Sequence, residues 1–207
     1  MGAKREPSRD LILWIDTETS GLDPASDELL EVAVLITDNE LHELGSRSCV
    51  VSPSAPLAEV VDAMDPVVLE MHTRNGLLAA LRAGEGRPAS VVDEELSRWL
   101  RTSAGAGPFL LGGNSITLDR NFLAGGSPRL FGMLHHRSID VTSVHEDLRR
   151  DGFAREVDLL RSQLPRTDAH RALGDIRDSV RELRVLRSLR RGVPLDKALH
   201  EHGAAAA

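Results

Sequence analysis

The sequence has no tyrosine, one cysteine and few other aromatic residues, with four Phe and two Trp in 207 residues. With so few rings, a broad platform for stacking nucleic-acid bases has few candidate residues. The single cysteine, Cys49, excludes an internal disulfide and a cysteine-based zinc site. A lone cysteine is typical of a reducing compartment, so we expect a cytoplasmic protein.

Long apolar runs are also absent. The first run, residues 11–15 (LILWI), is too short for the core of a signal peptide or for a membrane-spanning helix. We expect the polar residues 1–10 to form a disordered leader and residues 192–207, which end in GAAAA, to form a C-terminal tail.

An excess of basic charge is missing as well. The chain has 25 Lys and Arg against 32 Asp and Glu, a net charge of −7. Proteins that grip long duplex nucleic acid neutralise many phosphates and are normally basic. The acidic balance therefore favours a short substrate, or acids masked by bound metal.

The apolar patterns predict one α/β domain over residues 11–191, in which helices flank a mixed central sheet. Strands are expected first, as a three-stranded meander at 11–16, 28–37 and 41–51, and later at 109–112 and 138–141. Helices are expected at 66–82 with a break near Asn75 and Gly76, and at 90–102, 117–124 and 168–191. We interpret the arginine-rich stretch 181–191 as a solvated helix face.

Four acids and a histidine stand where these elements begin or end. Asp16 and Glu18 end the first strand at i, i+2 spacing, which points both side chains to one face. Asp119 opens a helix, where an acid alone is explained by the helix dipole. His170 and Asp175 are about 140° apart on an ideal helix, so they share a site only if His170 lies on the lead-in.

Each feature alone has a plain structural explanation, but the set matches the needs of two-metal phosphodiester hydrolysis. Mg²⁺ and similar hard cations prefer oxygen ligands, and a pair of them stabilises the attacking and leaving oxygens. A neutral histidine near pH 7 accepts the proton of the attacking water.

The same residues resemble the DEDD exonucleases that carry a catalytic histidine. WIDTETSGLD is similar to their first motif, GNSITLDRNFL to their second and HRALGDIRDS to their third. Within this family, the GNSITLDRNFL, MHTRNGL and SIDVTS segments resemble the oligoribonucleases, over residues 11 to 190. The resemblance implies a ribonuclease H-like fold, and cleavage of short single-stranded RNA, including dinucleotides, from the 3′ end to 5′-mononucleotides.

The resemblance also implies roles for individual residues. Two Mg²⁺ or Mn²⁺ ions are expected at Asp16, Glu18, Asp119 and Asp175, with Asp16 bridging them and His170 as general base. Substrate contacts are expected at Leu22, which wedges between bases, and at His72, Ser115, His136, Arg137 and Thr142. Arg137 is expected to act in the partner's site of a homodimer, where it caps the 5′ phosphate.

Departures from the family pattern leave other functions open. Val67 stands where relatives have Trp and His136 where they have Tyr, which reduces stacking on the substrate bases. A related exonuclease on single-stranded DNA, or a hydrolase of a nucleotide metabolite, is therefore an alternative. A catalytically silent nucleotide-binding protein is a further alternative, although no ligand or base is missing. Residues 145–166 resemble the family poorly.

Overall fold

The computed structural model describes residues 10–164 and 171–203. The strands are β1 (Ile12–Thr19), β2 (Leu29–Thr37), β3 (Glu43–Ser52), β4 (Arg87–Pro88), β5 (Phe109–Gly113) and β6 (Leu134–Asp140). The helices are α1 (Leu57–Ala63), α2 (Pro66–Arg74), α3 (Leu77–Arg82), α4 (Ala89–Ala104), α5 (Thr117–Gly126), α6 (Pro128–Phe131), α7 (Val141–Leu148), the wide turn η1 (Arg149–Phe153), α8 (Ala154–Gln163), α9 (Ala172–Arg190) and α10 (Leu195–His202).

One mixed sheet organises these elements, in the order β4-β3-β2-β1-β5-β6. The expected meander is present, since β1, β2 and β3 pair antiparallel, whereas β5 and β6 continue from β1 in parallel. Parallel neighbours need crossover helices, and α5 and α6 supply this connection between β5 and β6. The predicted α/β class with a mixed sheet between helices is confirmed.

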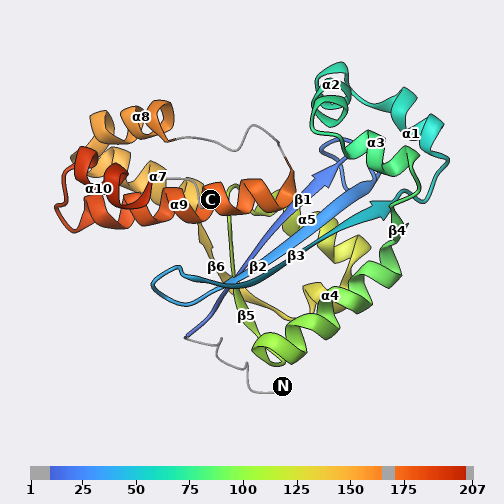
Figure 1. The fold of residues 1–207 in the computed structure, drawn as a ribbon, viewed down its shortest axis with the longest axis horizontal. Helices are drawn as coiled ribbons and strands as arrows, with labels where there is room; N and C mark the ends of the chain where they lie inside the picture. Colours follow the sequence, from blue (N-terminus) through green and yellow to red (C-terminus); the bar gives the residue numbers. More distant parts are fainter. Residues whose placement is uncertain (1–9, 165–170, 204–207) are drawn as a thin grey trace.

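The two faces of the sheet carry separate apolar cores. Because side chains alternate along a strand, Leu13 and Ile15 join the core under α4, α5 and α6. Ile12 and Trp14 point the other way, into the core covered by α7 to α10 (Figure 1). The same alternation places Asp16 and Glu18 on the α9 face, beyond Trp14. The indole Nε1 of Trp14 is satisfied inside this core by Thr37 Oγ1, at 3.0 Å.

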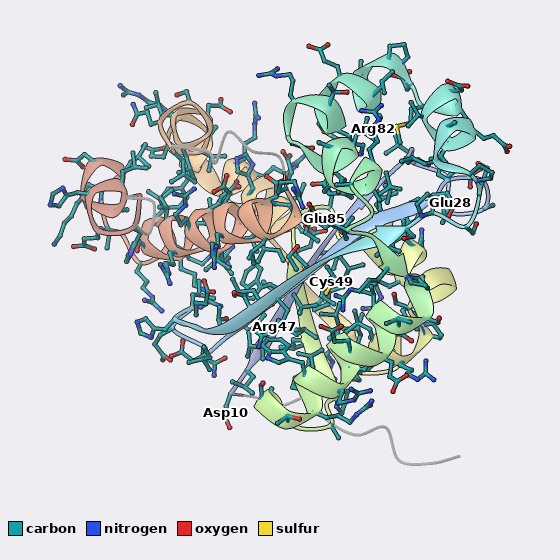
Figure 2. All side chains as sticks on the ribbon, turned by 45° about the vertical axis from the view of Figure 1, so that its right-hand side comes forward. Asp10, Glu28, Arg47, Cys49, Arg82 and Glu85 are labelled. Atoms are coloured by element: carbon teal, nitrogen blue, oxygen red, sulfur yellow. The ribbon has the colours of Figure 1, made fainter. Side chains whose placement is uncertain are left out.

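A third cluster joins α1, α2 and α3 to the start of β2. Buried Leu30 packs there with Leu77, Leu78 and Leu81. The predicted helical stretch 66–82 is divided at Asn75 and Gly76, as expected: Gly76 has a φ of +79°, which a residue with a side chain adopts only at a cost. Cys49 is buried in β3, among the packed side chains at the centre of Figure 2.

The C-terminal third differs most from expectation. Residues 195–202, expected to lie in a tail, form α10, whose Ala198 is buried against the core that α9 covers. The described residues 145–164 form the end of α7, then η1 and α8, and Leu148, Val157 and Leu160 join that core. Because α10 is rich in charge, its apolar side becomes apparent only against α9.

The arginine-rich stretch is also less solvated than expected. Arg181 is only 7% exposed, and it is ion-paired with Asp178. Arg184 and Arg187 donate hydrogen bonds to the carbonyl oxygens of Leu41 and Asn39 in the β2–β3 hairpin. These contacts dock α9 across the sheet. Among the described residues, no helix combines the length and the apolar character needed to cross a membrane.

Candidate active site

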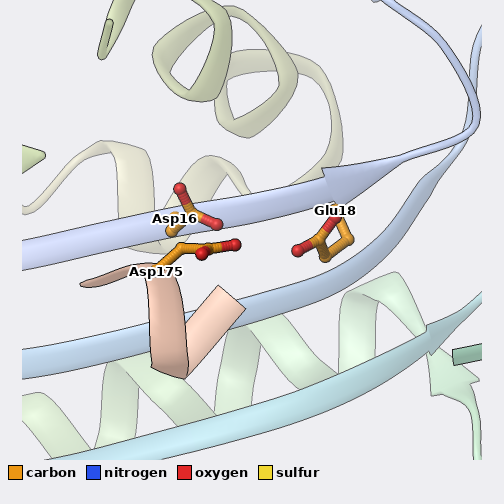
Figure 3. A group of neighbouring side chains, drawn as sticks. All are labelled: Asp16, Glu18 and Asp175. Atoms are coloured by element: carbon orange, nitrogen blue, oxygen red, sulfur yellow. The ribbon is translucent and has the colours of Figure 1, made fainter. Parts of the chain in front are cut away.

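Three carboxylates meet where β1 passes under the first turn of α9. Asp16 and Glu18 project from one face of β1, and Asp175 projects toward them from α9 (Figure 3). One oxygen of each carboxylate lies within 4.8 Å of the others. Residues 159 positions apart in the chain thus converge on one point, because α9 covers the same sheet face that carries Asp16 and Glu18.

Asp119 reaches this region from the opposite side. It lies in the first turn of α5, on the face that carries Thr17 rather than Asp16. Its Oδ1 accepts hydrogen bonds from the Thr17 amide at 2.8 Å and from the Thr17 hydroxyl at 2.7 Å. Asp119 is therefore next to the cluster but tied to the strand backbone, and it is not one of the three acids that share the 4.8 Å limit.

The packed negative charges disturb the protonation of these acids. Burial, followed by the charges of Asp119 and Glu18, raises the pKa of Asp16 well above its ordinary value. Burial, followed by the charge of Asp175, raises the pKa of Glu18 to about 8. Burial raises the pKa of Asp119 to about 6, although the hydrogen bonds from Thr17 oppose the change. Without a cation, burial and mutual repulsion therefore favour the protonated forms of these acids.

This donor set fits divalent cations. All the ligand atoms are carboxylate oxygens, the ligands that Mg²⁺ and Mn²⁺ prefer, and they come from rigid elements. A cation between the acids would turn their mutual repulsion into attraction. A cleft beside these acids has room for a ligand. It is lined by Asp16, Asn114, Leu164, Asp175, Asp178, Ser179 and Glu182.

His72 is buried beside the carboxylate cluster. It has no exposed surface, and its Nε2 lies 2.9 Å from the Thr19 carbonyl oxygen. Its Nδ1 lies 3.9 Å from a Glu18 carboxylate oxygen. Burial lowers the pKa of His72, so a neutral ring that donates to Thr19 fits this environment. In this structure His72 packs against the end of β1, and its contact with substrate stays a prediction.

Ser115 and Thr142, by contrast, form one polar unit. Their hydroxyl oxygens are 3.1 Å apart, at the ends of β5 and β6. The Asp140 carboxylate holds both loops, because it accepts hydrogen bonds from the amides of Ser115 and Thr142. Two side chains expected to contact substrate thus lie side by side.

Asn114 links this hydroxyl pair to α9. Its side-chain oxygen accepts a hydrogen bond from Thr142 Oγ1 at 3.2 Å, and its Nδ2 donates to Ser179 Oγ at 2.8 Å. Ser179 in turn donates to the Asp175 carbonyl oxygen at 2.9 Å. The chain of bonds runs from Ser115 to the turn that carries Asp175. Asn114 is not among the residues predicted from the sequence, although it stands inside the second motif.

The other expected substrate residues lie on the surface. Leu22 is an apolar side chain that is 76% exposed on the loop after β1. His136 and Arg137 are exposed on β6, where the ring of His136 lies against that of His135 at 4.0 Å between centroids. Val67, in place of an aromatic residue, is 74% exposed on α2. His170, the expected general base, lies outside the described residues.

Comparison with known proteins places the chain in a family. Residues 13–183 match the family model described as exonuclease. The chain belongs to the exonuclease family. It is 43% identical over 182 residues to the oligoribonuclease of Mycobacterium sp. (strain KMS), covering 86% of this chain and 80% of the relative. Identity to the oligoribonuclease of Leifsonia xyli is 42% over 177 residues, 85% of this chain and 82% of the relative.

These matches confirm the resemblance predicted from the three motifs. They also confirm that this protein is a nuclease, which hydrolyses phosphodiester bonds. Solved structures confirm the ribonuclease H-like fold. Exonuclease I from Methylocaldum szegediense superposes with a TM-score of 0.62 at 18% identity, over 93% of this chain and 43% of that one. A zinc-bound E. coli ExoI–ssDNA complex also superposes with a TM-score of 0.62 at 18% identity. This match covers 94% of this chain and 43% of that one. The exonuclease described here thus spans less than half the length of those structures.

Proposed function

We propose that this exonuclease removes 5′-mononucleotides from the 3′ end of short oligoribonucleotides, dinucleotides included, by metal-dependent hydrolysis. Identities of 39–43% to curated oligoribonucleases over 86% of the chain support the substrate class. The observation that carries the chemistry is the convergence of Asp16, Glu18 and Asp175 within 4.8 Å on one face of β1. Exonucleases of this type use divalent metal ions, and three carboxylates so close together suit such an ion as shared oxygen ligands.

Asp16, Glu18, Asp119 and Asp175 would hold two Mg²⁺ or Mn²⁺ ions, and Asp16 would be the ligand common to both. When bound, the two cations stabilise the attacking and the leaving oxygens of the in-line displacement. The hydrogen bonds from Thr17 orient one oxygen of Asp119, which leaves its other oxygen for a cation. His170 takes the proton of the attacking water. Its assignment rests on its place in the third motif, directly before Arg171.

Other residues of the chain would bind and orient the RNA. Leu22 is exposed on the loop that follows β1, where an apolar side chain can wedge between the two terminal bases. The Ser115–Thr142 hydroxyl pair offers polar contacts to the sugar–phosphate backbone. Val67 and His136 provide less stacking surface than the aromatic residues of relatives, so affinity for bases depends more on these polar contacts.

Substitution of one ligand and of the base tests the proposal. Asp16→Asn keeps the shape of the side chain but removes its charge, and His170→Ala removes the proton acceptor. We expect each variant to lose about 10²–10⁴-fold in the rate of Mn²⁺-dependent cleavage of a labelled dinucleotide. Asp147→Asn, which changes an acid exposed on α7 and paired with Arg190, is the matched control. Near-normal cleavage by Asp16→Asn, with the control also active, would show that the cluster is not the catalytic centre.

We further propose a homodimer in which Arg137 of one subunit completes the site of the other. Mixing two inactive variants tests this arrangement directly. Asp16→Ala and Arg137→Ala are exchanged by unfolding and refolding together, so that about half of the dimers are mixed and each mixed dimer holds one complete site. About a quarter of the wild-type activity is expected to return. If no activity returns although mixed dimers are detected by mass, Arg137 does not act across the interface.

A second candidate is an exonuclease on single-stranded DNA or a hydrolase of a nucleotide metabolite. Val67 and His136, which replace family aromatic residues, favour it, and a similarly folded protein is described as an ExoI–ssDNA complex. Initial rates on RNA and DNA of two to twelve nucleotides, and on mononucleotide derivatives, separate the candidates. Preference for long strands or for DNA would replace the proposed substrate, and binding without turnover in Mn²⁺ would indicate a silent nucleotide-binding protein.

We also propose that the protein works in the cytoplasm. This rests on the single cysteine, which is buried and free. Cell fractionation that recovered the protein outside the cytoplasm would contradict the assignment.

A further inference from the structure

Glu31 is a buried acid in the middle of the otherwise apolar strand β2. Its side chain is 1% exposed, in the segment LLEVAVLIT. A carboxylate in such a place is costly unless donors surround it. Glu31 has four: the Nε and one terminal nitrogen of Arg171 at 2.8 and 2.7 Å, the Ser48 hydroxyl at 2.6 Å and the Ala172 amide at 3.3 Å. The apolar strand therefore contains one fully bonded anionic anchor.

This anchor stands next to the proposed metal site. Glu31 is directly opposite Glu18 in the antiparallel β1–β2 pair, so both side chains lie on the face that α9 covers. Like charges in such a pair repel each other. Although burial alone would raise it, hydrogen bonds from Arg171 and Ser48 bring the pKa of Glu31 below its ordinary value. Glu31 thus remains an anion whose two oxygens are bonded to Arg171. Because the Arg171 guanidinium is taken up by Glu31, Glu18 can bind a cation instead.

The same anchor determines where α9 begins. Arg171 is the residue that precedes the first turn, and no side chain of α9 itself caps that turn. Glu31 takes over this task from the neighbouring strand, because it binds both the Arg171 guanidinium and the Ala172 amide. The Asp175 amide closes the first turn on the Arg171 carbonyl oxygen at 3.1 Å. Asp175 is therefore one helical turn away from the point at which Glu31 holds the helix.

We propose that Glu31 is a positioning residue of the metal site: through Arg171 and Ala172 it fixes the first turn of α9, so that the Asp175 carboxylate stays opposite Asp16 and Glu18. The proposal rests on the proposed function, since it assumes that these three acids bind the cations. Groups that orient metal-binding side chains typically change metal affinity or activity by about 10–100-fold when they are substituted. An ordinary packing residue changes only the stability of the fold.

The chain contains a matched control for this test. Glu43 and Arg177 form a second bidentate pair between the sheet and α9, at 3.1 and 3.0 Å, but that pair is partly exposed and does not touch the first turn. Glu31→Gln and Glu43→Gln remove the same charge from two tethers of one helix. Binding of Mn²⁺ by titration calorimetry, and the Mn²⁺ concentration that gives half-maximal dinucleotide cleavage, are measured for both variants and for the wild type.

We expect Glu31→Gln to bind Mn²⁺ about 10–100-fold more weakly and to need correspondingly more Mn²⁺ for activity, whereas Glu43→Gln stays near the wild type. Arg171→Lys, which keeps the charge but loses the fork of donors, should show the same defect in weaker form. Wild-type Mn²⁺ affinity in a folded Glu31→Gln variant overturns the proposal, and so does an equal loss in Glu43→Gln, which would indicate general docking of α9.

If Glu31→Gln does not fold, Arg171→Lys decides, because the Arg171 side chain is partly exposed and the backbone amide of Ala172 still reaches Glu31. Wild-type Mn²⁺ affinity in Arg171→Lys then overturns the proposal. If the wild type binds Mn²⁺ but cleaves no dinucleotide, the proposed substrate fails while calorimetry still tests the role of Glu31. If the wild type binds no Mn²⁺, both proposals fail.

Discussion

Replacement of Glu18 by Gln should stabilise the metal-free exonuclease at alkaline pH while it removes metal-dependent activity. The buried Glu18 carboxyl has its pKa raised to about 8 by burial and by the nearby charge of Asp175. An acid with a raised pKa in the folded state makes its full contribution to stability at pH values below its pKa in the unfolded state. This contribution is lost as the pH rises through its pKa in the folded state. The loss therefore falls between about pH 4.5 and pH 8.

The magnitude follows from the difference between the two pKa values. A rise from 4.5 to about 8 corresponds to an upper limit of about 5 kcal/mol, at ~1.4 kcal/mol per pH unit. The neighbouring charges of Asp16 and Asp175 border a cleft open to water, which screens them, so we take about 2 kcal/mol as the expected effect. For a chain of this size that amounts to about 4–8 °C in melting temperature. A glutamine cannot ionise and escapes the loss.

Thermal melting in EDTA at pH 5 and pH 8 measures this effect. The melting temperature of Glu18→Gln should match the wild type at pH 5 and exceed it at pH 8, and saturating Mn²⁺ should reverse the order because only the wild type binds it well. Glu43→Gln is a control of opposite sign, since hydrogen bonds from Arg177 lower the pKa of Glu43. A pH-independent difference for Glu18→Gln, or a lower melting temperature at pH 8 in EDTA, would refute the reasoning.

Three further substitutions test other parts of the structure. Asp93→Ala removes a buried acceptor of the first two amides of α6, at 3.1 and 2.8 Å, and should cost about 1–3 kcal/mol in urea unfolding without changing Mn²⁺ dependence; a loss of Mn²⁺ affinity would contradict this. Trp14→Phe leaves the buried Thr37 hydroxyl without its 3.0 Å donor and should cost about 1–3 kcal/mol, which an unchanged urea midpoint would disprove. Val67→Trp adds a ring at an exposed position and should lower the KM for a dinucleotide about fivefold or more, from roughly 1–3 kcal/mol of stacking; an unchanged KM would mean that this surface does not contact bases.

The elements that sequence patterns locate best are those with a strong local signal. The meander β1–β3 and the helices α4, α5 and α9 begin and end close to the predicted positions, because apolar periodicity and turn residues bound them. The helices α7, α8 and α10 were missed, since they alternate few apolar residues with many charges. Their burial comes from contact with α9, which no local window contains.

The same distinction between local sequence signals and tertiary contacts applies to the acids of the site. Spacing alone placed Asp16 and Glu18 on one face of a strand, and the three motifs alone identified the exonuclease family. The fold decides that this face is the one covered by α9, because Ile12 and Trp14, which alternate in step with Asp16 and Glu18, pack against that helix. Spacing could not place Asp119, which approaches from the other side of the sheet and is tied to Thr17.

By itself, then, the sequence determined the family, the strand that carries the first two acids and the helix that carries Asp175. Only the tertiary structure decided that Asp175 meets Asp16 and Glu18, that His72 is buried behind Glu18, and that Glu31 caps α9 from the neighbouring strand. The physical reason is that local patterns specify which residues form an element and which side of it is apolar. The meeting of side chains from separate elements depends on how a helix packs across a sheet, and that is set by contacts between residues far apart in the chain.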